Sequence, residues 1–413
     1  MKKNMGNKIL LISAQGRCKS NAMLSARLVK YFMENNYSLT KKTKEADLIV
    51  VNSCGFRRED ERVTENIIKK ALKKCNVISK IISVGCLNKI NEKVLKDCSN
   101  KILLIDNFSE FDSLIKAKKS FNTFKNSCHD KKLFNQIVWT RWNLFYWHDV
   151  SGKILFFVTQ AIIKCKKKLS VNRAHLGEIS NEENFDNKLY VQIGSGCVSD
   201  CSYCVIKKAR GSINSRPMGD ILSDIREGYR KGMTVNLVAD DCGSYGSEIG
   251  LNLFDLVSAI NNDFPKTKID LCYINPVWLE KHTEKYYEMF KKYSIGNANI
   301  PVQAGSNRII KLMNRKYKIQ NILSIINHIK EISPKTMLWS HFIIDYPTET
   351  WKEFWLMIKT TQSFHHVYCF NYSSPDRNNY KKIWAILRQT TKHAITRLFI
   401  YKIILGKLLR SLR

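Results

Sequence analysis

The sequence predicts an α/β protein with an N-terminal doubly wound parallel sheet domain, an incomplete (β/α)6 barrel and a basic helical tail. Two stretches, residues 1–120 and 188–375, alternate short apolar runs rich in β-branched residues with longer amphipathic runs. Such alternation is typical of parallel sheets whose strands are joined by helices. Residues 121–187 break the alternation and separate the two domains.

Composition narrows the class of protein. A chain of 413 residues with 44% hydrophobic residues suits two or three domains with real cores. Its polar start lacks the apolar run of a secretory signal, so we expect the 13 cysteines in a reducing cytoplasm, where clustered thiols bind metals or catalyse reactions. The formal net charge of +32 indicates a polyanionic partner, nucleic acid or an anionic membrane, although a Lys- and Asn-rich codon bias would also raise it.

The first domain is expected to place three cysteines at one edge of its sheet. Cys18, Cys54 and Cys86 each follow a strand-like run, and the carboxyl ends of parallel strands meet at one edge. Converging thiols suit an iron–sulfur cluster, while three unrelated loop cysteines are the alternative. The expected strands are 8–13, 47–51, 80–84 and 101–105, and the expected helices are 22–34, 59–74 and 91–98.

Residues 121–187 form a basic and aromatic segment. Between residues 131 and 174 there are nine Lys or Arg and one acid, Asp149, and the apolar run 154–163 is too short to span a bilayer. One interpretation is a helical linker that packs on both domains. The other is a surface for RNA or for the membrane interface. The crowded aromatic residues are Phe134, Trp139, Trp142, Phe145, Tyr146 and Trp147.

The second domain is expected to contain six strand–helix units, which is fewer than a closed barrel needs. The expected strands are 189–193, 235–239, 269–274, 298–302, 338–344 and 367–372, and the expected helices are 221–231, 253–261, 279–292, 308–314, 319–332 and 351–361. The tail, residues 376–413, reads from residue 380 as one or two amphipathic helices with nine Lys or Arg and no acid. It either closes the barrel or binds RNA or an anionic membrane.

The most specific motif is the spacing of Cys197, Cys201 and Cys204, directly after the first strand of the second domain. Three thiolates can hold three irons of a [4Fe–4S] cluster and leave the fourth open. An open iron can chelate the amino and carboxylate groups of S-adenosylmethionine, and one electron then cleaves the sulfonium to a carbon radical. A zinc knuckle or a disulfide loop is disfavoured, because zinc sites use CxxC pairs in two separated halves.

With these motifs the sequence resembles the radical SAM methylthiotransferases over residues 8–120 and 188–375. The wording Asp-Asp-Cys-Gly-Ser-Tyr-Gly at 240–246 favours the branch that acts on threonylcarbamoyladenosine in tRNA. The other matching segments are 16–21 with Ser25, 52–54, 85–86, 196–206, 210–211, 215–217, 300–306 and 312–317.

The resemblance implies two [4Fe–4S] clusters, one on the cysteines of the second domain and one on those of the first, which presents the sulfur. It also implies S-adenosylmethionine, with Tyr203, Gln303 and Ser306 as candidate contacts, although simple packing would explain these three residues equally well. Arg210 and Arg216 are candidate contacts to substrate phosphate or ordinary surface residues. An electron donor such as flavodoxin or ferredoxin is implied as a partner.

Two departures leave the substrate open. After residue 375 nothing alternates as strands do, so we expect no C-terminal RNA-binding β-barrel. Asp345 and Thr348 stand where the family normally has glycine. A tRNA enzyme would replace the barrel with its basic segments, since phosphate contacts are largely electrostatic. The alternatives are an enzyme acting on a peptide or small-molecule natural product, and a non-enzymatic iron–sulfur protein tethered to a membrane or RNA.

Overall fold

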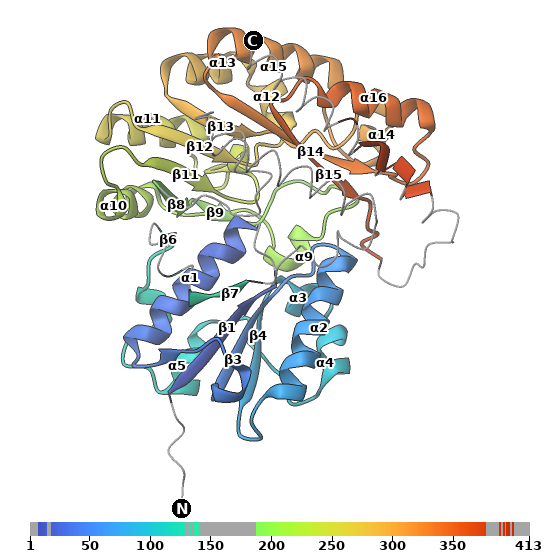
Figure 1. Cartoon of the computed structure of the whole chain (residues 1–413). Helices are drawn as coiled ribbons and strands as arrows, with labels where there is room; N and C mark the ends of the chain where they lie inside the picture. The colour runs from blue at the N-terminus through green and yellow to red at the C-terminus, as the bar shows by residue number, and fades with distance from the viewer. Residues whose placement is uncertain are drawn as a thin grey trace, which may run out of the picture. The chain divides into compact units, whose positions relative to one another are not determined.

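The structure, a computed structural model, describes residues 7–14, 18–128, 133, 136–139 and 187–376, with 388, 389, 391, 392, 394–396 and 399 (Figure 1). It divides into two compact units, Met1–Cys54 with Arg62–Lys188 and Gly55–Glu61 with Leu189–Arg413. Most of the predicted basic and aromatic segment, and most of the tail, lie outside the described residues. Each unit is therefore treated by itself.

The first unit contains the predicted parallel sheet. Its strands run in the order β2-β1-β3-β4-β5, with β7 also paired to β1, and every one of these pairs is parallel. The strands are β1 (Lys8–Ser13), β2 (Ser38–Leu39), β3 (Leu48–Ser53), β4 (Lys80–Gly85), β5 (Leu103–Leu104) and β7 (Val138–Trp139); the helices include α1 (Lys19–Glu34), α2 (Arg58–Lys74), α3 (Cys86–Ile90), α4 (Glu92–Cys98) and α5 (Ser109–Ile115).

Both faces of this sheet are apolar. Leu11 and Val50 pack with Phe32 of α1 on one face, and a second cluster gathers on the other. The second cluster joins Leu10 to Ile68 of α2. Strands that are buried on both faces read as nearly continuous apolar runs, which explains why the sequence predicts them well.

The second unit contains a sheet in which the strands β8, β11, β12, β13, β14 and β15 follow one another in chain order. This arrangement confirms the predicted α/β class. The strands are β8 (Lys188–Gln192), β11 (Thr234–Val238), β12 (Lys268–Cys272), β13 (Ile295–Asn299), β14 (Met337–Ile344) and β15 (His366–Asn371). The helices are α9 (Ile206–Arg210), α10 (Met218–Gly228), α11 (Leu253–Asp263), α12 (Pro276–Lys281), α13 (Thr283–Lys292), α14 (Asn307–Leu312), α15 (Ile319–Ile332) and α16 (Trp351–Thr361).

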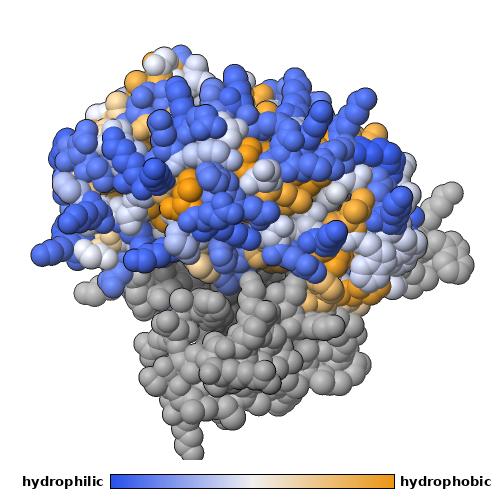
Figure 2. Space-filling model, turned by 90° about the horizontal axis from the view of Figure 1, so that it is seen from above, coloured by the Kyte–Doolittle hydropathy of each residue, from blue (hydrophilic) through white to orange (hydrophobic). Residues whose placement is uncertain are grey.

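The helices of this unit cover one face of its sheet. Leu237 and Phe342 from the strands pack with Leu256 of α11, Ile326 of α15 and Phe354 of α16 in one large core. Figure 2 shows a mostly hydrophilic outer surface with smaller apolar areas, as expected for helices whose apolar stripes face inward. Within the described ranges, the structure shows no helix with the length and apolarity needed to cross a membrane.

Candidate active site

The cysteine loop of the second unit, residues 197–204, lies between the short strand β9 (Gly194–Ser195) and α9. Burial is the largest cause that raises the pKa of Cys204 to about 12, and the neighbouring thiols of Cys201 and Cys197 contribute to this shift. Backbone N–H groups of Ser199 and Ile206 lie 3.4 Å from the sulfurs of Cys197 and Cys204. Buried thiols that resist ionisation need a nearby cation to become thiolates, and bound iron would supply that charge.

The loop is held rigidly by segments that follow the strands. The Ser202 backbone N–H donates to Met313 O (3.1 Å), and its hydroxyl donates to Leu312 O (2.9 Å). The Asn314 side chain donates to Asp200 O at 2.8 Å. Gly196 has a φ of 78°, and a side chain there would collide with the Ser212 carbonyl, so only glycine fits this entry to the loop.

The motif at 240–246 supports the same loop. Asp240 accepts hydrogen bonds from the Gly196 N–H (2.9 Å) and from Arg210 (2.8 Å). Arg216 binds Asp224 at 2.9 Å and Gln192 O at 2.7 Å. The two arginine side chains are only 16% and 19% exposed, so they bind internal groups and are not placed as free phosphate contacts.

The three other predicted contacts also have partners within the protein. The Tyr203 hydroxyl accepts from Arg315 at 2.7 Å. Gln303 has a φ of 67°, and its backbone bonds both His341 O and the Ile343 N–H. The Ser306 hydroxyl donates to Glu353 at 2.8 Å. A cofactor role for Tyr203, Gln303 and Ser306 stays a prediction.

The first unit brings its three cysteine segments together. Cys18 directly precedes α1, Cys54 follows β3, and Cys86 opens α3 at the end of β4. The buried Asn52 amide donates to Asn21 O and to Ser25 Oγ, both at 2.8 Å, which ties β3 to α1.

The third segment is tied to the same place. The Ser53 hydroxyl donates to Val84 O at 2.5 Å. Gly85 has a φ of 95°, and a Cβ there would lie 2.6 Å from Asn52 Oδ1 and from Ser53 O. The ends of β3 and β4 therefore approach too closely for any side chain at this position.

Comparison with known proteins assigns the two units. Residues 191–361 match the Radical SAM superfamily, and residues 10–105 match Uncharacterized protein family UPF0004. The chain is 28% identical over 386 residues to a tRNA-2-methylthio-N(6)-dimethylallyladenosine synthase of Staphylococcus epidermidis, with 91% of this chain and 67% of that protein covered. It is 26% identical over 363 residues to the ribosomal protein uS12 methylthiotransferase RimO of Acetivibrio thermocellus, with 86% of this chain and 73% of that protein covered.

The two family matches and both relatives support the predicted resemblance to the radical SAM methylthiotransferases. These similarities confirm the predicted type of enzyme, a transferase, and the predicted cofactors, S-adenosylmethionine and iron–sulfur clusters. A solved cobalamin-dependent S-adenosylmethionine radical enzyme, OxsB, matches with a TM-score of 0.50 and 12% identity, covering 86% of this chain and 52% of that one. The chain spans about half the length of that enzyme, and the likeness concerns the fold alone.

The residues present fit iron–sulfur clusters by the chemistry of their donors. Each unit offers a set of three candidate thiols, and a [4Fe–4S] cluster takes one thiolate on each of its ligated irons.

In the first unit, the buried atoms Asn21 Nδ2 and Asn52 Oδ1 find no hydrogen-bond partner among the described residues. Over the same residues, no three His, Cys, Asp or Glu side chains surround a point closely enough to hold a single metal ion.

The structure adds a feature that the sequence interpretation missed, on the strand positions that point away from the helix-packed core. We call it the aromatic face: Trp339, His341, His366, Tyr368 and Phe370. The His341 ring lies 5.3 Å from Tyr368 and 5.4 Å from Phe370 between centroids. The Trp339 ring lies 4.8 Å from His366. The alternation of these residues along β14 and β15 is the signal that would have found them.

Amide side chains adjoin the aromatic face. The Asn299 side-chain nitrogen lies 3.1 Å from His341 Nε2, and Asn297 donates to Asp270 at 2.8 Å. Burial lowers the pKa of His341 to about 4, so this imidazole is neutral at pH 7. Tyr273, whose ring lies 5.5 Å from His341, brings the face to the carboxyl end of β12.

Proposed function

We propose that this protein is a methylthiotransferase that inserts a methylthio group at an unactivated C–H of a modified adenosine in tRNA. The observation that carries the substrate class is the aromatic face with its amide side chains. Flat rings stack on bases, and amides bond base edges, so this lining suits an uncharged purine taken out of the RNA stack. The neutral His341 is consistent with such a ligand.

Contacts through Tyr273 and Asn275 link the aromatic face to the cysteine loop. Tyr273 is followed two residues later by Asn275, whose amide donates to the Ser199 hydroxyl inside the loop at 2.9 Å. Arg315 joins the two as well, since it donates to Asn275 and to Tyr203, each at 2.7 Å. A base held on the aromatic face would therefore be near the loop that holds the radical chemistry.

Each group of residues has a role in this proposal. Cys197, Cys201 and Cys204 would hold the cluster that binds S-adenosylmethionine, and Cys18, Cys54 and Cys86 would hold the second cluster. Bound S-adenosylmethionine and the clusters would supply radical C–H activation and the methylthio sulfur, with electrons from a flavodoxin or ferredoxin in the cytoplasm. The chain's own part is to fix these groups, to hold the base and to exclude water.

Charge supports an RNA substrate, since a net charge of +32 attracts a polyanion over long range. The threonylcarbamoyladenosine branch is the finer prediction, from the motif at 240–246. The relatives reported above are named for dimethylallyladenosine in tRNA and for ribosomal protein uS12. The second of these names favours a peptide substrate as the alternative.

The deciding experiment is mass spectrometry of nucleosides from total tRNA of cells with and without the gene. We expect a methylthio-adenosine derivative that depends on the gene and disappears in a Cys201→Ala strain. Its mass would identify the modified adenosine and so test the branch. An unchanged nucleoside profile would contradict the tRNA proposal and direct the search to ribosomal proteins and small molecules.

A further inference from the structure

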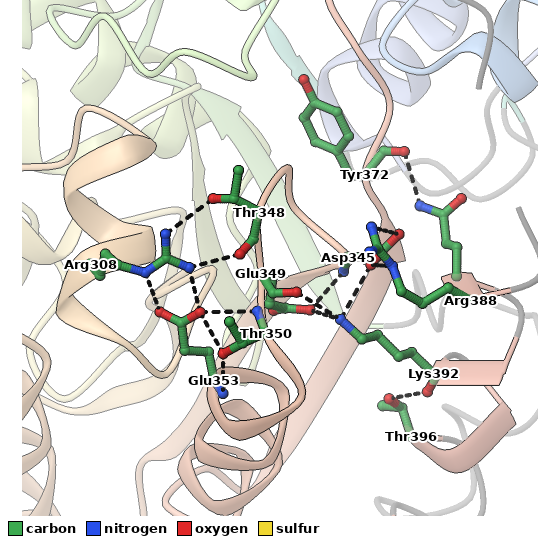
Figure 3. A network of polar contacts seen from close by, with 11 residues as sticks. Arg308, Asp345, Thr348, Glu349, Thr350, Glu353, Tyr372, Arg388, Lys392 and Thr396 are labelled. Atoms are coloured by element: carbon green, nitrogen blue, oxygen red, sulfur yellow. Dashed lines mark hydrogen bonds and ion pairs between the residues drawn. The ribbon is translucent and has the colours of Figure 1, made fainter. Parts of the chain in front are cut away.

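A buried ionic network joins the turn after β14 to Lys392, close to the end of the chain (Figure 3). The Lys392 side chain is 0% exposed, and its Nζ lies 3.2 Å from Asp345 Oδ1 and 2.8 Å from Glu349 Oε2. Arg388, whose side chain is 44% exposed, places its Nε 2.8 Å from Asp345 Oδ1. Two buried carboxylates are thus neutralised by two cations of the tail, Arg388 and Lys392.

The turn that they hold has an unfavourable backbone. Asp345 has a φ of 58° and Thr348 a φ of 68°, a region that residues with a Cβ avoid, β-branched threonine above all. Such conformations persist only where the surroundings enforce them. At the Thr348 end, Arg308 does so: it donates to Thr348 O and to Glu353, both at 2.8 Å.

At the Asp345 end the enforcing group is Lys392. Glu349 Oε2 accepts from the Asp345 N–H at 3.1 Å, so the two carboxylates face each other across a short turn. Burial raises the pKa of Glu349, and Asp345 raises it further, while Lys392 acts in the opposite direction. Removing the lysine would leave two buried like charges with one half-exposed partner, which is a strongly unfavourable arrangement.

The same turn reaches the cysteine loop. Between its two braced ends lies Tyr346, whose hydroxyl is 2.8 Å from Ser202 Oγ and 3.1 Å from Leu312 O. Ser202 stands between Cys201 and Cys204 in the sequence. A continuous set of contacts therefore leads from Lys392 through the turn to the backbone that spaces two cluster cysteines.

We propose that Lys392 is a positioning residue for the cysteine loop: by docking between Asp345 and Glu349 it fixes turn 345–350 and, through Tyr346, the loop 198–204. The tail thereby sets the geometry of the S-adenosylmethionine site and does more than add positive charge for a substrate. The effect on cofactor binding rests on the cluster ligation in the proposed function, whereas the effect on the loop backbone does not.

Hydrogen exchange of the full-length protein, followed by mass spectrometry, tests the proposal. Lys392→Met keeps most of the side-chain stem and removes the charge; Lys359→Met, an exposed lysine of α16, is the matched control. We expect Lys392→Met to speed exchange in 345–350 and in 198–204 by about tenfold or more, with α11 unchanged. In the reconstituted enzyme, KM for S-adenosylmethionine cleavage should rise more than kcat falls, and Lys359→Met should alter neither.

Two further variants keep the test decisive if Lys392→Met folds poorly. Adding Asp345→Asn and Glu349→Gln removes the charge imbalance and should restore slow exchange in the loop. Tyr346→Phe should speed exchange in 198–204 while leaving the turn protected. The proposal is overturned if Lys392→Met loosens the turn alone, or all segments alike. If the unmodified enzyme cleaves S-adenosylmethionine normally but makes no tRNA product, the proposed function is contradicted and the inference about Lys392 is unaffected.

Discussion

Each unit carries three cysteines that are candidate cluster ligands, but the two units position these cysteines differently. In the second unit the cysteines share one loop, 197–204, which is held by residues that follow β12, β13 and β14. In the first unit Cys18, Cys54 and Cys86 come from segments far apart in the chain, joined by the side chains of Asn52 and Ser53. The cysteines of the second unit are brought together largely by their spacing in the sequence. Those of the first unit come together only once its sheet has formed.

The largest expected effects come from removing one cysteine of each unit, because the two sets of cysteines should act in different steps of the reaction. Cys201→Ala should abolish reductive cleavage of S-adenosylmethionine, because the cluster that would bind this cofactor loses one of its three thiolate ligands. Cys54→Ala should spare that cleavage and abolish the methylthio product. The check is to measure 5′-deoxyadenosine and methylthiolated product with each reconstituted variant and a strong reductant. A methylthiolated product from Cys54→Ala would refute the sulfur-donor role of the first unit.

The next comparison replaces one glycine in each unit with alanine. Gly196→Ala and Gly85→Ala each force a side chain into backbone atoms at a positive φ, so each should lower stability by about 3 kcal/mol or more. Gly196→Ala should also lose the iron of the cysteine loop, and Gly85→Ala that of the first unit. Iron content and urea unfolding of the two proteins check this, each serving as the control for the other. Equal iron loss in both would show that the two sites are not independent.

The fold was predictable because strand and helix periods alternate clearly in both units. Among the strands the largest displacement is that of β13, which begins at Ile295 and not at the predicted residue 298. Gly296 and Asn297 weaken the strand signal there, and the Asn297 side chain donates to Asp270 in the neighbouring strand. A partner in another strand is invisible to a local pattern.

The site was predictable where its chemistry is local. The cysteine spacing identifies the loop directly, but the carboxylate partners of Arg210 and Arg216 are visible only in the folded structure. The aromatic face was missed because aromatic residues in strands are usually counted as core. The role of Lys392 was unpredictable because its partners lie more than 40 positions away in the sequence.

The smallest expected effect concerns His341 on the aromatic face. Its folded pKa of about 4 lies below the ordinary value of 6.5, so the unfolded chain binds more protons between these values. Stability should therefore fall as pH drops from about 6.5 towards 4, by at most about 3 kcal/mol from this residue. His341→Phe, which keeps a ring among Tyr368 and Phe370, should show a shallower fall. Urea unfolding of both proteins at pH 7 and pH 5 measures the difference, and identical pH dependence would mean that His341 is not buried as a neutral imidazole.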